Sequence, residues 1–241
     1  MNNEKVVILC GGKGTRLQEE TEFRPKPLVP IGEMPILFHI MKTYSNYGFN
    51  KFILCLGYKG QMINDFFSEN KQIQGENWDI IFADTGVESQ TGSRIKQIEK
   101  HIDSDIFLAT YGDGISNINI TGLFNFHKKQ NTIGTLSAVH PHSKYGLIKE
   151  GKNHIVENFV EKPVLYDYIN GGFFVFKKEF FDYLSKDESC ILEREALSNL
   201  VSKKQLSMYK HEDFWHCMDT YKDYLELNEM WRNKNTPWKV W

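Results

Sequence analysis

The sequence VVILCGGKGTRL, residues 6–17, decides the fold class. Its first part, Val6–Cys10, is a short apolar run, which predicts a strand buried on both faces of a sheet. The run leads directly into the glycine-rich turn GGKGTR, residues 11–16. Open α/β sheets bind their ligands at such turns, at the carboxyl ends of the strands. We therefore expect an α/β protein with a ligand site at residues 11–16.

The segments that follow alternate between strand and helix patterns. We predict strands at 52–56, 79–83 and 106–111, helices at 35–47, 61–67 and 94–101, hairpin-like strands at 134–140, 146–149, 154–161 and 172–176, and a further strand at 206–210. Alternating strands and helices are typical of a parallel sheet covered on both faces, whereas the hairpins add antiparallel strands. The sequence thus predicts a Rossmann-like three-layer αβα fold with a mixed, mainly parallel sheet.

The organisation of the chain is simple. No repeat, low-complexity tract or linker is present, so we expect one domain, 1–241. The polar segment 68–77 is expected to be a surface loop. The aromatic residues Phe173, Phe174, Trp231, Trp238 and Trp241 are expected in the core or at a subunit contact, which leaves a homo-oligomer open.

Composition excludes several classes of partner. The net charge of −2 over 241 residues gives no general positive field for nucleic acid, so phosphate binding must be local. No apolar run approaches the roughly 20 residues that span a bilayer, and no signal-peptide core is present, so we expect a cytoplasmic protein without a membrane partner. The four cysteines match no zinc pattern and are expected to be reduced core thiols.

The glycine turn favours a nucleoside triphosphate as ligand. A Walker A loop would need Ser or Thr after Lys13, where Gly14 stands, and a dinucleotide fingerprint would need glycine at Leu17. Backbone N–H groups of the turn can approach a triphosphate closely, and Arg16 can pair with its oxygens. A turn with only a structural role is the alternative.

Lys26 strengthens this prediction. It lies between Pro25 and Pro27, on a stiffened backbone shortly after the glycine turn. A rigidly placed ammonium group can neutralise charge that develops at the α-phosphorus during attack. The alternative for Lys26 is a solvated surface lysine.

Further short blocks of sequence extend along nearly the whole chain. They are GGKGTRL (11–17), PKPLVPIG (25–32), GYKG (57–60), DTG (84–86), TGSRIK (91–96), TYGDGI (110–115), VEKP (160–163), INGGFFVF (169–176), FWHCMDT (214–220) and PWKVW (237–241). In this order they resemble the sugar-1-phosphate nucleotidyltransferases, a family with the nucleotide-diphospho-sugar transferase fold. The last three blocks are typical of its glucose-1-phosphate cytidylyltransferase branch.

The resemblance implies a nucleotide-binding half at 1–115, an acceptor-binding and C-terminal half at 116–241, and a set of site residues. It implies that Asp113 and Asp219 hold Mg²⁺, which is consistent with the preference of this ion for carboxylate and phosphate oxygens. The implied catalytic residues are Arg16, Lys26 and Asp113. The implied nucleotide-binding residues are Leu9, Gly11, Gly12, Gly14, Thr15, Arg16, Lys26, Thr91, Gly92 and Gly112. The implied acceptor-binding residues are Tyr145, Gly146, Glu161, Lys162, Asn170 and Gly171.

The implied reaction is transfer of CMP from CTP to a small phosphorylated acceptor, with glucose 1-phosphate as the expected acceptor. The segment between Phe67 and Trp78 is shorter than in the cytidylyltransferases, which leaves the oligomeric state open. A different sequence at 140–145 keeps a non-sugar acceptor open, such as a phosphorylated amino acid or a polyol phosphate for surface-polysaccharide synthesis. UTP or dTTP in place of CTP also stays open. A non-catalytic nucleotide-sensing subunit would be expected to lose Asp113, Asp219 or the lysines, and this sequence keeps them.

Overall fold

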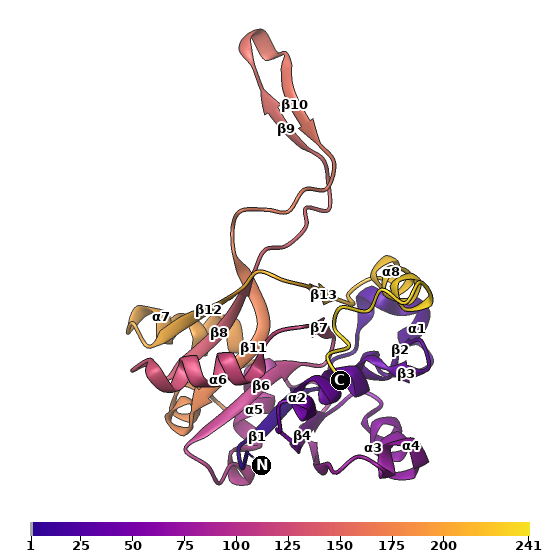
Figure 1. Ribbon diagram of the computed structural model, residues 1–241. Coiled ribbons are helices and arrows are strands. Elements are labelled where there is room, and N and C mark those ends of the chain that lie inside the picture. Colours follow the sequence, from indigo (N-terminus) through magenta and orange to yellow (C-terminus); the bar gives the residue numbers. More distant parts are fainter. Residues whose placement is uncertain (1) are drawn as a thin grey trace.

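A central sheet of seven strands organises the molecule. The computed structural model describes residues 2–241, apart from the side chain of Gln72. The strands lie in the order β12-β8-β11-β6-β1-β4-β5, and only β11 runs against its neighbours (Figure 1). Their bounds are β1 Lys5–Leu9, β4 Lys51–Leu56, β5 Asp79–Asp84, β6 Ile106–Tyr111, β8 Gly134–Val139, β11 Ile169–Lys177 and β12 Leu206–His211. The predicted mixed, mainly parallel sheet is confirmed.

Helices cover both faces of this sheet. Their bounds are α1 Gln18–Thr21, α2 Ile36–Asn46, α3 Gly60–Glu69, α4 Lys71–Gln74, α5 Thr91–Gln97, α6 Ile120–Lys129, α7 Leu197–Ser202 and α8 Tyr221–Arg232. One apolar cluster includes Ile8, Leu37 and Trp238, and a second includes Val7, Ile95 and Phe181. Because Val7 and Ile8 are successive residues of β1, they point to opposite faces, and the two clusters are the two cores of a three-layer structure.

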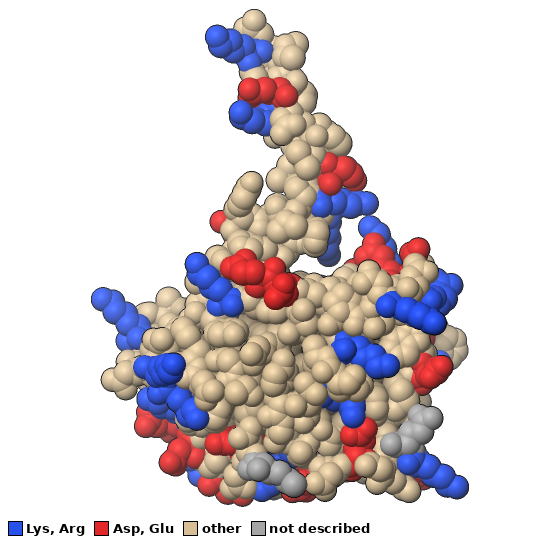
Figure 2. Space-filling model, in the orientation of Figure 1, with Lys and Arg blue, Asp and Glu red and all other residues tan. Residues whose placement is uncertain are grey.

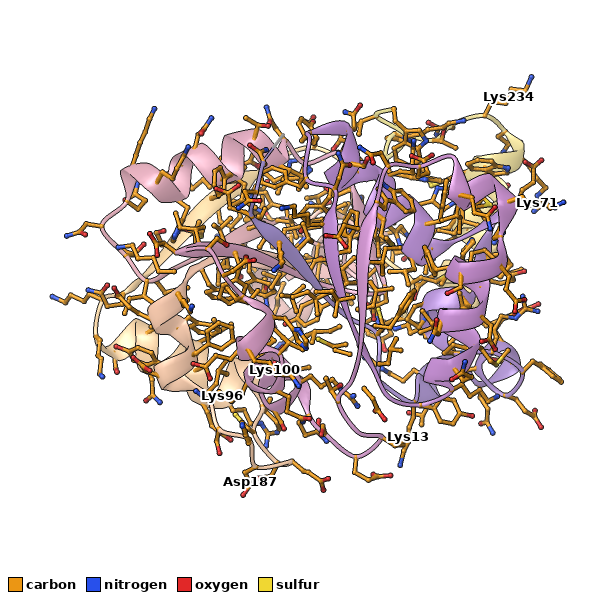
Figure 3. All side chains as sticks on the ribbon, turned by 90° about the horizontal axis from the view of Figure 1, so that it is seen from below. Lys13, Lys71, Lys96, Lys100, Asp187 and Lys234 are labelled. Atoms are coloured by element: carbon orange, nitrogen blue, oxygen red, sulfur yellow. The ribbon has the colours of Figure 1, made fainter. Side chains whose placement is uncertain are left out.

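Most charged side chains lie at the surface, and Arg94 is a buried exception. Figure 3 shows the interior filled with side chains, with Lys13, Lys71, Asp187 and Lys234 at the periphery. Within residues 2–241, the helices are too short or too polar to cross a bilayer.

Two small sheets bring distant segments together. β2 (Pro30–Ile31) pairs with β3 (Met34–Pro35), and β7 (Gly114–Ser116) pairs with β13 (Trp215–Cys217). The second pairing matters for function, because it aligns the segment after Asp113 with the segment before Asp219.

A long hairpin arm projects from the body. It consists of β9 (Leu147–Glu150) and β10 (Val156–Val160), an antiparallel pair that stands away from the central sheet (Figure 1). All nine strand residues are exposed. The sequence predicted these strands, but not that they leave the sheet.

Two other predictions need correction, and one strand was missed. The segment 68–77 is not a loop throughout, because it contains α4, whose Ile73 is buried in the core. The predicted helix at 94–101 begins earlier, at Thr91, and its last part is a separate 3₁₀ turn, Glu99–His101. The strand β13 was not predicted, because three residues are too few to show a period.

Candidate active site

A cavity of about 320 Å³ opens where β1 and β6 end. Ten of the predicted site residues line it, which are Leu9, Gly11, Gly12, Gly14, Thr15, Arg16, Lys26, Thr91, Gly112 and Asp113. Sequence reasoning gave no role to Cys10, Pro27, Ser89, Gln90, Arg94 and Tyr111, which line it as well. The glycine turn, the proline-flanked lysine and the start of α5 therefore meet in one place.

Gly92 lies outside this lining. Its amide donates a hydrogen bond to the Cys190 carbonyl oxygen at 3.0 Å, and a Cβ at this position would come within 2.7 Å of the Cys190 sulfur. The glycine thus lets α5 pack closely against the segment before the turn at Leu192–Ala196. Gly92 was predicted to bind the nucleotide, but in the structure it packs against Cys190 and does not line the cavity.

Arg94 ties the cavity walls together. Its guanidinium group, with the residue only 3% exposed, donates hydrogen bonds to the carbonyl oxygens of Gly11 at 3.0 Å, Leu56 at 3.0 Å and Gly86 at 2.7 Å. A Cβ on Gly11 would lie 2.1 Å from this group, so only glycine fits there. Burial lowers the pKa of Arg94, but an arginine stays charged at neutral pH. Its position four residues before Ile98, on the apolar side of the helix, was the sequence signal that it points inward.

Asp113, Lys26 and Asp219 form a compact ionic cluster. The Lys26 ammonium group lies 2.6 Å from an Asp113 oxygen and 2.7 Å from an Asp219 oxygen. Arg16 lies 2.9 Å from the second Asp219 oxygen. The three residues predicted to be catalytic and the two predicted to hold metal are thus in direct contact.

The backbone fixes both carboxylates. Met218 donates its amide hydrogen bond to the Asp113 carbonyl oxygen at 2.9 Å, which joins the two segments. Thr220 and Asp223 form a capping box at the start of α8, and the Asp223 carboxylate also accepts the Asp219 amide at 3.0 Å. Asp219 is therefore held immediately before the N-cap residue of a well-capped helix.

The charges in the cluster stabilise one another. Burial opposes ionisation of Asp219, but the hydrogen bond from Lys26 and the charges of Lys26 and Arg16 outweigh it, so the Asp219 pKa is lowered. Burial likewise opposes the charge on Lys26, yet its interactions with Asp113 and Asp219 raise the Lys26 pKa. Asp219 and Lys26 therefore each favour the charged form.

The donor set suits a divalent cation. One oxygen each of Asp113 and Asp219 and the Cys217 sulfur lie within 4.8 Å of one another. Carboxylate oxygens are among the ligands that Mg²⁺ favours.

The expectation of core thiols is wrong for Cys217, which is half-buried at this cluster, whereas Cys10, Cys55 and Cys190 are buried.

Two of the predicted acceptor residues lie next to the cavity. Asn170 donates a hydrogen bond to the hydroxyl group of Tyr111 at 3.3 Å, and Tyr111 lines the cavity. The Gly171 carbonyl oxygen accepts a hydrogen bond from the Trp215 indole at 2.7 Å. A β-bulge in β11 follows, where Gly172 has a φ of 80° and a Cβ would lie 2.6 Å from the Tyr111 ring. The double glycine thus lets β11 approach the end of β6.

The other four predicted acceptor residues lie on the arm or at its base. Glu161 and Lys162 are both exposed and lie 3.6 Å apart, whereas Tyr145 is 78% exposed. A Cβ on Gly146 would approach the Phe159 ring at 2.6 Å, which places this glycine inside the hairpin. None of the four is among the residues that line the cavity.

The chain belongs to the nucleotidyl transferase family, whose profile matches residues 5–234. It is therefore a nucleotidyltransferase, and the resemblance drawn from the sequence blocks is confirmed. A Bacillus subtilis protein named probable glucose-1-phosphate cytidylyltransferase is 42% identical over 98% of this chain and 100% of its own length. The glucose-1-phosphate cytidylyltransferase of Salmonella typhimurium is 39% identical over 98% of this chain and 99% of its own length.

Solved structures support the fold. HddC from Yersinia pseudotuberculosis superimposes with a TM-score of 0.70 at 23% identity, over 95% of this chain and 99% of that one. A UDP-glucose pyrophosphorylase in complex with UDP-glucose gives a TM-score of 0.75 at 19% identity, over 96% of this chain and 99% of that one. At these identities the likeness concerns the fold alone, which is the one predicted.

Proposed function

We propose that this enzyme transfers CMP from CTP to glucose 1-phosphate and releases pyrophosphate, with Mg²⁺ as cofactor. The observation that carries the proposal is the cluster of Asp113, Lys26 and Asp219 beside a glycine-lined cavity. The choice of CTP and of glucose 1-phosphate is supported by the names of the Bacillus and Salmonella relatives, which align over their whole lengths. The chain is proposed to act as one domain, with residues 1–115 binding the nucleotide.

The proposed reaction is an in-line displacement at the α-phosphorus of CTP. A phosphate oxygen of the acceptor forms the new bond, the bond to the bridging oxygen of the β-phosphate breaks, and pyrophosphate leaves with the electron pair. A phosphate monoester has a second pKa of about 6, so the nucleophile is already deprotonated at neutral pH. No general base is required, and the main task is to hold two anions together.

Cations in the cluster meet this task. When bound, Mg²⁺ would be held by Asp113 and Asp219 and would neutralise charge on the triphosphate. Lys26 and Arg16 place further positive charge at the cavity, where Lys26 is largely buried and Arg16 largely exposed. Backbone amides of the turn at Gly11–Gly14 donate to phosphate oxygens. Together these groups cancel the repulsion between nucleophile and triphosphate.

The acceptor is proposed to lie between the nucleotide and the base of the arm. Asn170, beside Tyr111, supplies an amide for acceptor hydroxyls, whereas Glu161 and Lys162 approach from the arm and bind hydroxyls and phosphate. Because Glu161 and Lys162 do not line the cavity, we propose that they reach the acceptor through movement of the arm or from a neighbouring subunit. A non-sugar phosphate remains the second candidate, favoured by the departure at 140–145.

Pyrophosphate release tests the proposal directly. The purified protein is assayed with Mg²⁺ and each of CTP, UTP, dTTP, ATP and GTP, against glucose 1-phosphate, a polyol phosphate and a phosphorylated amino acid. We expect release with CTP and glucose 1-phosphate. Release only with a non-sugar phosphate would move the function to another pathway, and silence throughout would favour a regulatory, nucleotide-sensing subunit.

We also propose that the arm is covered by a second copy of this chain. The pair Leu147 and Val160 is opposed in register, as is the next pair, Ile148 and Phe159, so each face of the hairpin carries an apolar pair. Ile148 is 65% exposed and Phe159 60% exposed, and an isolated two-stranded sheet is at best marginally stable in water.

Charge favours a copy of the same chain over an anionic partner. Two lysines, at 149 and 152, are balanced by two glutamates, at 150 and 157, within residues 147–160. Figure 2 shows the arm as a mostly uncharged surface with a few charges of both signs. Such a surface can pair with itself, Lys against Glu, but has no net charge to attract nucleic acid or an acidic membrane.

Light scattering during gel filtration tests the arm. We expect the wild type to form an oligomer and the double variant Ile148→Lys, Phe159→Lys to be a monomer of unchanged helix content. Val201→Lys is the control, because Val201 is 62% exposed on α7, away from the arm. A monomeric wild type, or an oligomer that both substitutions leave intact, would contradict the proposal.

A further inference from the structure

A thiol stands beside the two carboxylates of the active site. Cys217 ends β13 and lies opposite Gly114 of β7, so it is one residue along from Asp113 across the pairing and two residues before Asp219. Its sulfur and one oxygen of each carboxylate lie within 4.8 Å of one another. The proposed function needs only the two carboxylates, so the thiol is unexplained.

These three atoms can meet one metal ion. Bonds to zinc are about 2.3 Å from sulfur and about 2.0–2.2 Å from carboxylate oxygen, so at the tetrahedral angle a sulfur and an oxygen on one ion lie about 3.6 Å apart. The ligand atoms of Asp113, Cys217 and Asp219 lie within 4.8 Å of one another, so side-chain shifts of about 1 Å bring them to one ion. The Lys26 ammonium group now lies between the carboxylates and has to move aside, as it does for any cation bound there.

Sulfur changes which ions this arrangement accepts. Mg²⁺ is a hard cation that takes oxygen ligands, so it would use the carboxylates and leave the thiol unbound. Thiolates prefer softer ions, such as Zn²⁺, Co²⁺ and Cd²⁺, for which mixed sulfur and oxygen sets are suitable. A pair of carboxylates without a thiol would not give thiophilic cations this additional ligand.

We propose that Cys217 is a third metal ligand, which makes the active site a binding site for thiophilic divalent cations in competition with Mg²⁺. This inference rests on the proposed metal role of Asp113 and Asp219. On binding, the thiol releases its proton to solvent and a sulfur–metal bond forms, without any change of oxidation state. Zn²⁺ or Cd²⁺ then occupies the place of Mg²⁺ at the triphosphate.

Cd²⁺ titration of the full-length protein tests the proposal. The wild type, Cys217→Ser and Cys190→Ser are compared, and the ultraviolet charge-transfer band of the cadmium–thiolate bond is followed. We expect one thiolate bond per chain in the wild type and in Cys190→Ser, whose substituted cysteine is buried elsewhere. We expect no such band in Cys217→Ser, with Cd²⁺ affinity weakened about tenfold or more.

Alkylation gives a second readout. Because burial raises the pKa of the Cys217 thiol and only the thiolate is alkylated, iodoacetamide is applied at alkaline pH. Cys217 is half-buried, whereas the other three cysteines are buried, so it should be labelled first. Cd²⁺ should protect this thiol and Mg²⁺ should not. Absence of the band in the wild type, persistence of the band in Cys217→Ser, or equal protection by both ions would each overturn the proposal.

These outcomes separate the inference from the proposed function. Normal Mg²⁺-dependent pyrophosphate release without a cadmium–thiolate band would reject the metal role of Cys217 and keep the function. A Cys217-dependent band in a protein that releases no pyrophosphate with any tested substrate would keep the thiophilic site and reject the function.

Discussion

Asp113 makes one contact through its side chain and another through its backbone, and a substitution can remove the first without the second. Its carboxylate contacts Lys26, whereas its carbonyl oxygen accepts the Met218 amide. Asp113→Asn keeps the backbone contact and the side-chain volume but removes the negative charge. We predict a fall in the rate of pyrophosphate release of about 10²-fold or more, the cost of losing a preorganised electrostatic group. Asp167→Asn, on the exposed surface, is the control, and near-normal turnover of Asp113→Asn would remove this residue from the mechanism.

Lys26 contacts both carboxylates that we propose as metal ligands, so its removal should change metal binding. In Lys26→Met the two carboxylates lose their common partner, and we predict a loss of about 1–3 kcal/mol in the free energy of unfolding without metal. Mg²⁺ should then raise the melting temperature more in this variant than in the wild type, because no ammonium group has to be displaced. Lys129→Met, at an exposed position on α6, should behave as the wild type. Equal Mg²⁺ effects on Lys26→Met and the wild type would show that Lys26 does not occupy the metal position.

The role of Arg94 shows what residue patterns could and could not predict. The glycine turn, Lys26, Asp113 and Asp219 all lie in short sequence blocks, so their place at one site could be predicted from the sequence. The contacts of Arg94 with Gly11, Leu56 and Gly86 join three separate loops, and no local pattern indicates them. Cys217 was missed for a similar reason, because its neighbour Asp113 is distant in sequence.

The turn after β1 contains two adjacent glycines with opposite surroundings. A Cβ on Gly11 would lie 2.1 Å from the buried Arg94 guanidinium group, whereas a Cβ on Gly12 would meet nothing within 4 Å. We predict that Gly11→Ala lowers stability by about 1–3 kcal/mol through overpacking and weakens CTP binding. Gly12→Ala should change the stability of the ligand-free protein by less than about 0.5 kcal/mol. Urea unfolding and calorimetric CTP titration measure both effects, and equal stability of the two variants would contradict this account of the turn.

The positions of most strands and helices could be predicted from the sequence, but not which strands pair with each other. Buried runs such as residues 52–56 and 106–111 fix strands because only a central sheet accepts continuous apolar sequence. The hairpin of β9 and β10 has a strand pattern too, yet alternation does not say whether a strand joins the main sheet or stands apart. The short helix Lys71–Gln74 was hidden for another reason, because one buried residue, Ile73, anchors an otherwise polar segment.

The whole molecule places its site where the two halves of the chain meet. Asp113 belongs to the first half and Asp219 to the second, and the pairing of β7 with β13 brings them together. The three-layer fold was predictable because the strands are continuous apolar runs and the helices that cover them have apolar residues at helical spacing. The distance between the arm residues and the cavity was not, because it depends on how far a hairpin projects.

Two buried histidines should make the molecule sensitive to mild acid. His39 is 1% exposed and its Nε2 lies 3.0 Å from the Ile31 carbonyl oxygen, whereas His127 is fully buried with its Nδ1 2.8 Å from the Thr135 hydroxyl. Burial, more than any nearby charge, lowers the pKa of His39 to about 4 and that of His127 also to about 4. Both rings are neutral in the folded protein at pH values where the unfolded chain would already bind protons.

The sign of the effect follows from this difference. Above pH 6.5 neither state is protonated at these rings and they make no pH-dependent contribution, but between pH 6.5 and about 4 the unfolded state binds more protons and stability falls. At pH 4.5 each histidine should cost about 2–3 kcal/mol relative to pH 7. His39→Gln and His127→Asn keep an amide near the bonded ring nitrogen, and each should reduce the acid loss by that amount in urea unfolding. His154→Gln, at an exposed position on the arm, should lose as much stability as the wild type. If the buried-site variants lose as much as His154→Gln, the acid sensitivity arises from groups other than these two rings.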